Sequence, residues 1–88
     1  MKEIVIDCTA IDSRESFHSI FAQALAFPAW YGKNLDALHD CLTAIHAPTR
    51  LRLQDWDVAE IRLGDYGARA KTVIATAGFE NTDLEIIF

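Results

Sequence analysis

The sequence predicts a single α/β domain: a small three-stranded parallel sheet with about four helices, in the order β-α-α-β-α-α-β. Three short strand-like runs, at residues 3–7, 49–54 and 83–88, are separated by pairs of segments with helical spacing. Strands joined by such long helical connections run parallel, with right-handed crossovers favoured, although this leaves the strand order open. The chain has 88 residues, 51% of them hydrophobic, which suffices for one domain over residues 1–88 with a modest core and no need of disulfide bonds or a structural metal.

The first half of the chain begins with a buried strand. Residues 3–7 (EIVID) are short, apolar and β-branched. Asp12 and Glu15 resemble a capping box, with Ser13 as an alternative cap, for a helix that ends near Pro28. Apolar residues at helical spacing define this helix: Phe17, Ile20, Phe21 and Ala24. His18 and the later His46 are expected to be solvated surface residues.

An aromatic loop at 29–33 then leads into a helix with two different faces. Asn34 is suited to cap this helix, which should run to about Ile45 because Pro48 prevents its extension. One stripe is apolar: Leu35, Leu38, Leu42 and Ile45. The opposite stripe is polar: Asp36, His39, Asp40 and Thr43. Two carboxylates one turn apart, beside Trp30 and Tyr31 as exposed aromatics, predict a rigid acidic patch.

The second half is predicted to contain a strand, two helices and a last strand. Residues 49–54 alternate between leucine and polar side chains, which predicts a strand with one wet face and a two-layer arrangement. Residues 55–57 (DWD) offer a cap for a short helix through Ile61, with Gly64 as its stop. The next apolar stripe, Ala70, Val73, Ile74 and Ala77, predicts a helix that ends at Gly78. Trp56 is expected in the core, and residues 83–88 form the last strand.

Charge and cysteine usage narrow the functional classes. Eight Lys and Arg against thirteen Asp and Glu give a net charge of −5. This charge disfavours direct nucleic-acid binding and favours a basic partner. The alternative is that the charge only keeps the protein soluble. Cys8 and Cys41 lack metal-ligand spacing and are expected to be small buried hydrophobes. No apolar h-region or membrane-length run is present, so we expect a cytoplasmic protein that does not contact a membrane.

The acidic stripe has three possible roles on its residues alone. Asp36, His39 and Asp40 share a helix face and could serve a small metal-dependent enzyme, but there is no HExxH motif and no cluster offering a fourth ligand. The two aspartates could simply be acids of a first helical turn, and the two aromatics could cover the core. The third role is a protein-binding patch. We therefore expect no cofactor, no metal and no catalytic residue.

A resemblance to a known family favours the third role. Residues 28–42, PAWYGKNLDALHDCL, resemble the signature segment of the barstar family, intracellular inhibitors of secreted microbial ribonucleases. The similarity is weaker over the rest of the chain, where it covers the first strand, the helix before Pro28 and the DLEII-like last strand. It implies a three-stranded parallel sheet with helices and a non-catalytic inhibitor. The inhibitor would be a monomer when free and would form a one-to-one complex with a basic secreted ribonuclease.

The resemblance also implies roles for single residues. Asp40 would take the place of a substrate phosphate, Asp36 would add a second charge, and Trp30 would pack over the catalytic base of the nuclease. The remaining contact positions would be Tyr31, Gly32, Asn34, His39, Thr43 and Thr76, with Gly32 allowing close backbone approach.

Two positions depart from the family pattern. His39 stands where the best-known member has tryptophan, and Thr76 aligns with a position that supplies a further carboxylate. Lys33 adds a positive charge that is unfavourable opposite a basic cleft. These departures motivate an alternative, in which the chain is a barstar-like immunity or interaction module for a different basic toxin.

Overall fold

The computed structural model describes all residues from Met1 to Phe88 and has the predicted order of strands and helices. The first half contains β1 (Lys2–Asp7), a 3-10 turn η1 (Cys8–Ala10), α1 (Arg14–Leu25) and α2 (Leu35–Thr43). The second half contains β2 (Thr49–Gln54), α3 (Trp56–Leu63), α4 (Asp65–Glu80) and β3 (Leu84–Ile87). The predicted α/β class is confirmed. No helix is both long enough and apolar enough to cross a membrane.

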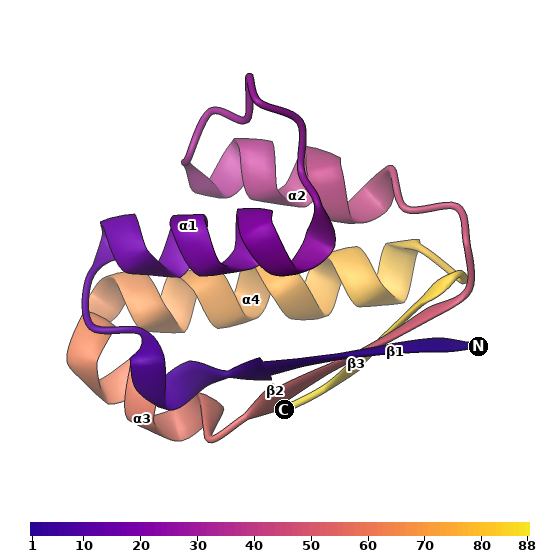
Figure 1. The fold of residues 1–88 in the computed structure, drawn as a ribbon. Coiled ribbons are helices and arrows are strands. Elements are labelled where there is room, and N and C mark those ends of the chain that lie inside the picture. Colours follow the sequence, from indigo (N-terminus) through magenta and orange to yellow (C-terminus); the bar gives the residue numbers. More distant parts are fainter.

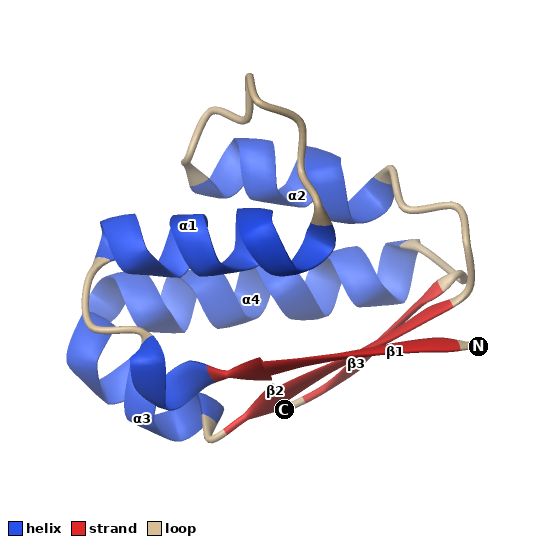
Figure 2. Ribbon diagram, in the orientation of Figure 1, coloured by secondary structure: helices blue, strands red, loops and turns tan.

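The three strands form one parallel sheet in the order β1-β2-β3, which places β2 at the centre. Helices α1, α2 and α4 all lie on the same side of this sheet (Figure 1). The opposite face of the sheet carries no helix, so the molecule has the two layers that the sequence predicted (Figure 2). Within the helical layer, α2 lies farther from the sheet than α4 does.

The open face of the sheet is covered by charged side chains. Arg50 lies 3.6 Å from a carboxylate oxygen of Glu3 and 3.1 Å from one of Glu85, and Arg52 lies 3.6 Å from Glu3. These pairs cross all three strands, although exposed pairs contribute only about 0–1 kcal/mol each. They confirm the prediction that one face of β2 is exposed to solvent.

The core lies between the sheet and the helices. Its largest fully buried side chains include Phe17 and Phe21 of α1, Leu38 and Leu42 of α2, and Leu51 and Leu53 of β2. The apolar stripes predicted for α1 and α2 are therefore the buried faces of these helices. Trp56 is buried as expected, and its indole Nε1–H donates to Glu60 Oε1 at 2.9 Å.

The helix ends differ from the predictions in detail. Helix α1 begins after Ser13, whose hydroxyl accepts from the Ser16 amide at 3.1 Å, so the capping box uses Ser13 rather than Asp12. Asp55 occupies the predicted N-cap position of α3, but it has a φ of 57° and makes no side-chain cap bond, and α3 runs past Ile61 to Leu63, with Gly64 as its C-cap as predicted. Helix α2 ends at Thr43, two residues before the expected Ile45.

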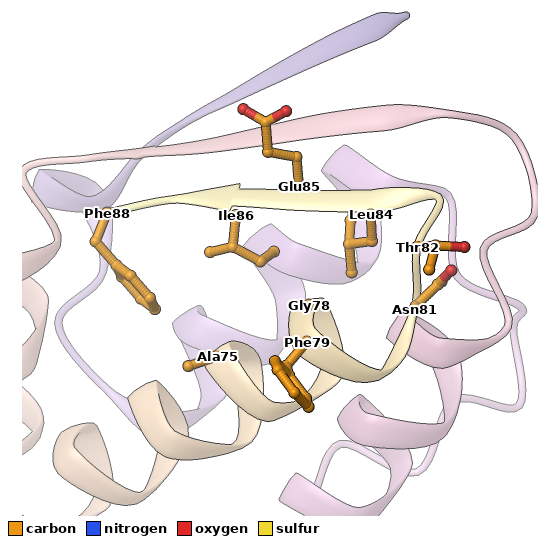
Figure 3. Close-up of a pocket in the computed structure, with 9 residues that line it drawn as sticks. All are labelled: Ala75, Gly78, Phe79, Asn81, Thr82, Leu84, Glu85, Ile86 and Phe88. Carbon is orange, nitrogen blue, oxygen red and sulfur yellow. The ribbon is translucent and has the colours of Figure 1, made fainter.

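Gly78 lies inside α4, which continues to Glu80, and does not end the helix. A Cβ at Gly78 would lie 2.6 Å from Cγ1 of Ile86 in β3. Figure 3 shows Ile86 and Leu84 pointing toward α4, whereas Glu85 points away from it. The glycine therefore allows α4 to lie close against β3, a packing role that a local pattern of helix stops does not reveal.

Candidate protein-binding site

The aromatic loop turns its two neighbouring aromatics in opposite directions. Trp30 is 81% exposed, whereas Tyr31 is 7% exposed and packs in the core with its ring centroid 4.8 Å from that of Phe27. The Tyr31 amide also donates to the Pro28 carbonyl at 2.9 Å, which tightens the turn. The expectation of two exposed aromatics was therefore wrong for Tyr31. Of these two aromatics, only Trp30 offers a large apolar surface to a partner.

A buried histidine holds the loop onto the helices. His18 Nδ1 lies 2.6 Å from the Tyr31 hydroxyl, and Nε2 lies 2.6 Å from the Tyr66 hydroxyl of α4. A neutral imidazole has one donor and one acceptor, and each hydroxyl can serve as either, so all three groups are satisfied. Burial, with a smaller contribution from Lys33, lowers the His18 pKa. The expectation that His18 is a solvated surface residue was wrong, whereas His46 is exposed as expected.

The loop ends in a well-formed cap of α2. Asn34 Oδ1 accepts from the Ala37 amide at 2.7 Å, which confirms the predicted N-cap. Lys33, rather than Gly32, has the left-handed backbone, with a φ of 54°. At Gly32, a Cβ would lie 3.3 Å from the side-chain nitrogen Nδ2 of Asn34, so a side chain there would press on the cap. Both residues are exposed, and Gly32 thus leaves bare backbone beside Trp30.

Helix α2 presents its polar stripe to solvent. Asp36 and Asp40 are both exposed, and the Asp40 side chain is 85% exposed. The apolar stripe is fixed in the core by Leu38 and Leu42, so the helix cannot rotate to hide the acids. The two carboxylates are therefore presented on a rigid element before any partner arrives.

Glu80 at the end of α4 adds a third carboxylate, which the sequence analysis missed. Its Oε1 lies 2.7 Å from His39 Nε2, while His39 Nδ1 lies 3.8 Å from Asp40 Oδ1. Chiefly through the hydrogen bond to Glu80, these carboxylates raise the His39 pKa. We call Asp36, Asp40 and Glu80, with His39 between the helices, the acidic ridge. Glu80 is 41 residues from His39, and only its place one turn after Thr76 could have indicated it.

The two threonines expected at the site differ in availability. The Thr43 hydroxyl donates to the His39 carbonyl at 2.8 Å and is part-buried, so its proton is already used within α2. Thr76 is exposed on α4, four residues before Glu80, and therefore lies on the same side of that helix. Thr76 thus belongs to the surface of the acidic ridge, while Thr43 lies at its margin.

The titratable groups do not converge as in a metal centre or a reactive thiol site. No three His, Cys, Asp or Glu side chains are grouped so that they could hold a metal ion. Cys8 is fully buried as expected, and burial raises its thiol pKa to about 12. Cys41 is half-buried, and its pKa is also raised by burial. Neither thiol is disposed to ionise near neutral pH.

Comparison with known proteins assigns the family. The family model described as Barstar (barnase inhibitor) matches residues 1–87. The chain belongs to the barstar family. A Bacillus subtilis (strain 168) protein named "Putative ribonuclease inhibitor YrdF" is similar, with 37% identity over 84 residues, which cover 94% of this chain and 92% of that protein. The resemblance found in the sequence is thus confirmed, and in this barstar-family chain the signature segment 28–42 forms the loop and most of α2.

Proposed function

We propose that this chain is a proteinaceous inhibitor that binds a microbial ribonuclease one to one and occludes its active site, without chemistry of its own. The observation that carries the proposal is the acidic ridge, which exposes carboxylates on a fixed helix beside Trp30. Membership of the barstar family and the similarity to a protein named as a ribonuclease inhibitor support it.

The physical basis is imitation of RNA phosphates. A ribonuclease cleft must carry cationic groups for its substrate, and charge-assisted hydrogen bonds to carboxylates satisfy the same groups. Because α2 is held by its buried stripe and its Asn34 cap, little conformational entropy is lost on binding. The net charge of −5 also favours fast, salt-sensitive encounter with a basic nuclease.

The proposed contacts centre on α2. Asp40 is the central anion, Asp36 and Glu80 lie beside it, and Trp30 packs over a group at the rim of the cleft. Secondary contacts come from Gly32, Asn34, His39, Thr43 and Thr76. Tyr31 acts indirectly in this proposal, because it holds the loop through His18 rather than touching the partner.

Inhibition of RNA cleavage tests the proposal. The wild-type protein is titrated against a secreted guanyl-type ribonuclease and against any nuclease encoded beside it. The Asp40→Asn variant is compared with Asp57→Asn, a matched change of an exposed aspartate in α3, which lies at the opposite end of the molecule from α2 (Figure 1). Asp40→Asn is expected to weaken inhibition at least tenfold, and Asp57→Asn to leave it unchanged. Unaltered cleavage by every nuclease, or equal effects of both variants, would refute the proposal.

A different basic toxin is the second candidate partner. The observation that favours it is the His39–Glu80 hydrogen bond, which places a titratable pair where the family's best-known member has tryptophan. This contact surface is smaller and more polar than a tryptophan. Purifying the tagged chain from its host and assaying the co-purified protein for RNA cleavage separates the two candidates. Size-exclusion chromatography of that complex reports the one-to-one stoichiometry.

A further inference from the structure

Three cationic side chains gather at the amino-terminal end of α2. Arg14 at the start of α1, Lys33 in the loop and Arg69 in α4 line a shallow cleft of about 380 Å³, together with Tyr66. All three cations are exposed, and none forms an ion pair, whereas Arg50 and Arg52 on the sheet are paired with glutamates. We call this group the cationic cleft. It is a concentration of positive charge on an acidic protein, with Asp36 as the one acidic side chain in its lining.

Fixed elements hold the cationic cleft in shape. The guanidinium carbons of Arg14 and Arg69 lie 4.3 Å and 5.4 Å from the centroid of the Tyr66 ring. The Tyr66 hydroxyl is in turn anchored to buried His18. Such cation–π contacts orient the two guanidinium groups, so the site is largely formed before a ligand binds.

The cationic cleft adjoins the acidic ridge, because Asp36 also lines it. The surface is therefore bipolar, with positive charge around the start of α2 and negative charge along the rest of the helix. Opposite a uniformly basic nuclease, the three cations would only weaken association, since like charges facing each other across an interface cost several kcal/mol. A partner that places an anion opposite them would convert this repulsion into attraction.

We propose that the cationic cleft binds a carboxylate of the partner ribonuclease, located beside the basic groove that the acidic ridge fills. This inference rests on the proposed function and extends it, because it specifies which basic nucleases are recognised. A nuclease with an Asp or Glu at that edge gains a charge-assisted contact. A nuclease with Lys or Arg there is rejected, so the cleft determines specificity through repulsion as well as attraction.

Association kinetics of Arg69→Glu and Lys71→Glu with the inhibited ribonuclease test the inference. Both variants change one positive to one negative charge on α4, but Lys71 lies outside the cleft, over the Phe88 ring. Added negative charge alone accelerates encounter with a basic partner in both variants. We expect Arg69→Glu instead to slow association on the order of fivefold at low salt, as a lost local pair would. Equal acceleration of both variants would overturn the inference.

A milder variant and a second probe make the result independent of folding and of the nuclease. Arg69→Gln removes only the charge and is expected to slow association about twofold. Titration of the free protein with tetraglutamate, followed by NMR, should shift signals of the cationic cleft in wild type and Lys71→Glu but not in Arg69→Glu. Shifts spread evenly over all Lys and Arg would overturn the inference even if no ribonuclease were inhibited.

Discussion

Removing the Tyr31 hydroxyl isolates the buried polar network that supports the aromatic loop. The variant Tyr31→Phe keeps the ring, and hence its packing against Phe27, and deletes only the oxygen. That oxygen is the partner of His18 Nδ1 at 2.6 Å, and His18 is only 2% exposed. Because no buried side-chain nitrogen or oxygen in the wild type lacks a partner, the variant creates a defect that the fold otherwise avoids.

The magnitude follows from the unsatisfied nitrogen. Leaving a buried polar group without its partner costs about 1–3 kcal/mol. For a domain of this size, each kcal/mol lowers Tm by roughly 4–8 °C, so we expect a decrease of about 4–24 °C. Total stability of such domains is about 5–15 kcal/mol, so the variant remains folded at room temperature.

Thermal and urea unfolding followed by circular dichroism measure this effect, with Trp30→Ala as the control. Trp30 is adjacent in sequence but 81% exposed, so its truncation should change stability by less than about 0.5 kcal/mol. Inhibition should show the reverse order, with Trp30→Ala impaired and Tyr31→Phe close to wild type below its Tm. A Tyr31→Phe protein as stable as wild type, or a Trp30→Ala protein that is the less stable of the two, would refute the reasoning.

Four further predictions concern pH and packing. Because burial lowers the His18 pKa, folded stability should fall below about pH 6.5, by up to about 1.4 kcal/mol per pH unit, in urea unfolding of His39→Gln. The raised pKa of His39 gives the opposite sign in a different pH range: stability from its bond to Glu80 is present below about pH 6.5 and lost as pH rises above it through the raised pKa, so wild type should lose stability there and His39→Gln should not. Protonated His39 also offsets ridge charge, so inhibition should weaken from pH 8 to 6 in wild type more than in His39→Gln with the same nuclease. Gly67→Ala should cost about 1–3 kcal/mol in the same unfolding assay, because its Cβ would lie 2.7 Å from the Glu60 carbonyl; an unchanged midpoint would contradict this clash.

The order of elements was predictable because each element carries its own local signal. The helical spacing of the leucines in α2 and the alternation of residues in β2 are each visible within a few residues, and the Asn34 cap marks where α2 begins. Binary patterns of this kind determine fold class. The strand order was not predictable, because both right-handed crossovers are compatible with more than one arrangement of three parallel strands.

Residues whose roles depend on distant partners were misjudged or missed. His18 looked solvated because it is polar, yet its partners Tyr31 and Tyr66 lie 13 and 48 residues away. The sequence likewise did not distinguish Trp30 from Tyr31, since two adjacent aromatics give no local sign of which one faces the core. Glu80 was missed because only the packing of α4 beside α2 brings it to His39.

These long-range contacts also link the stability of the fold to the shape of the proposed binding surface. His18 and Tyr66 support the loop that exposes Trp30, and the same Tyr66 ring orients Arg14 and Arg69 in the cationic cleft. The loop is therefore held by a buried network before a partner binds, so little conformational freedom is lost on binding. Loss of the Tyr66 hydroxyl should consequently weaken both the loop and the cleft. Tyr66→Phe is thus expected to lower Tm and to reduce the difference in association rate between wild type and Arg69→Glu.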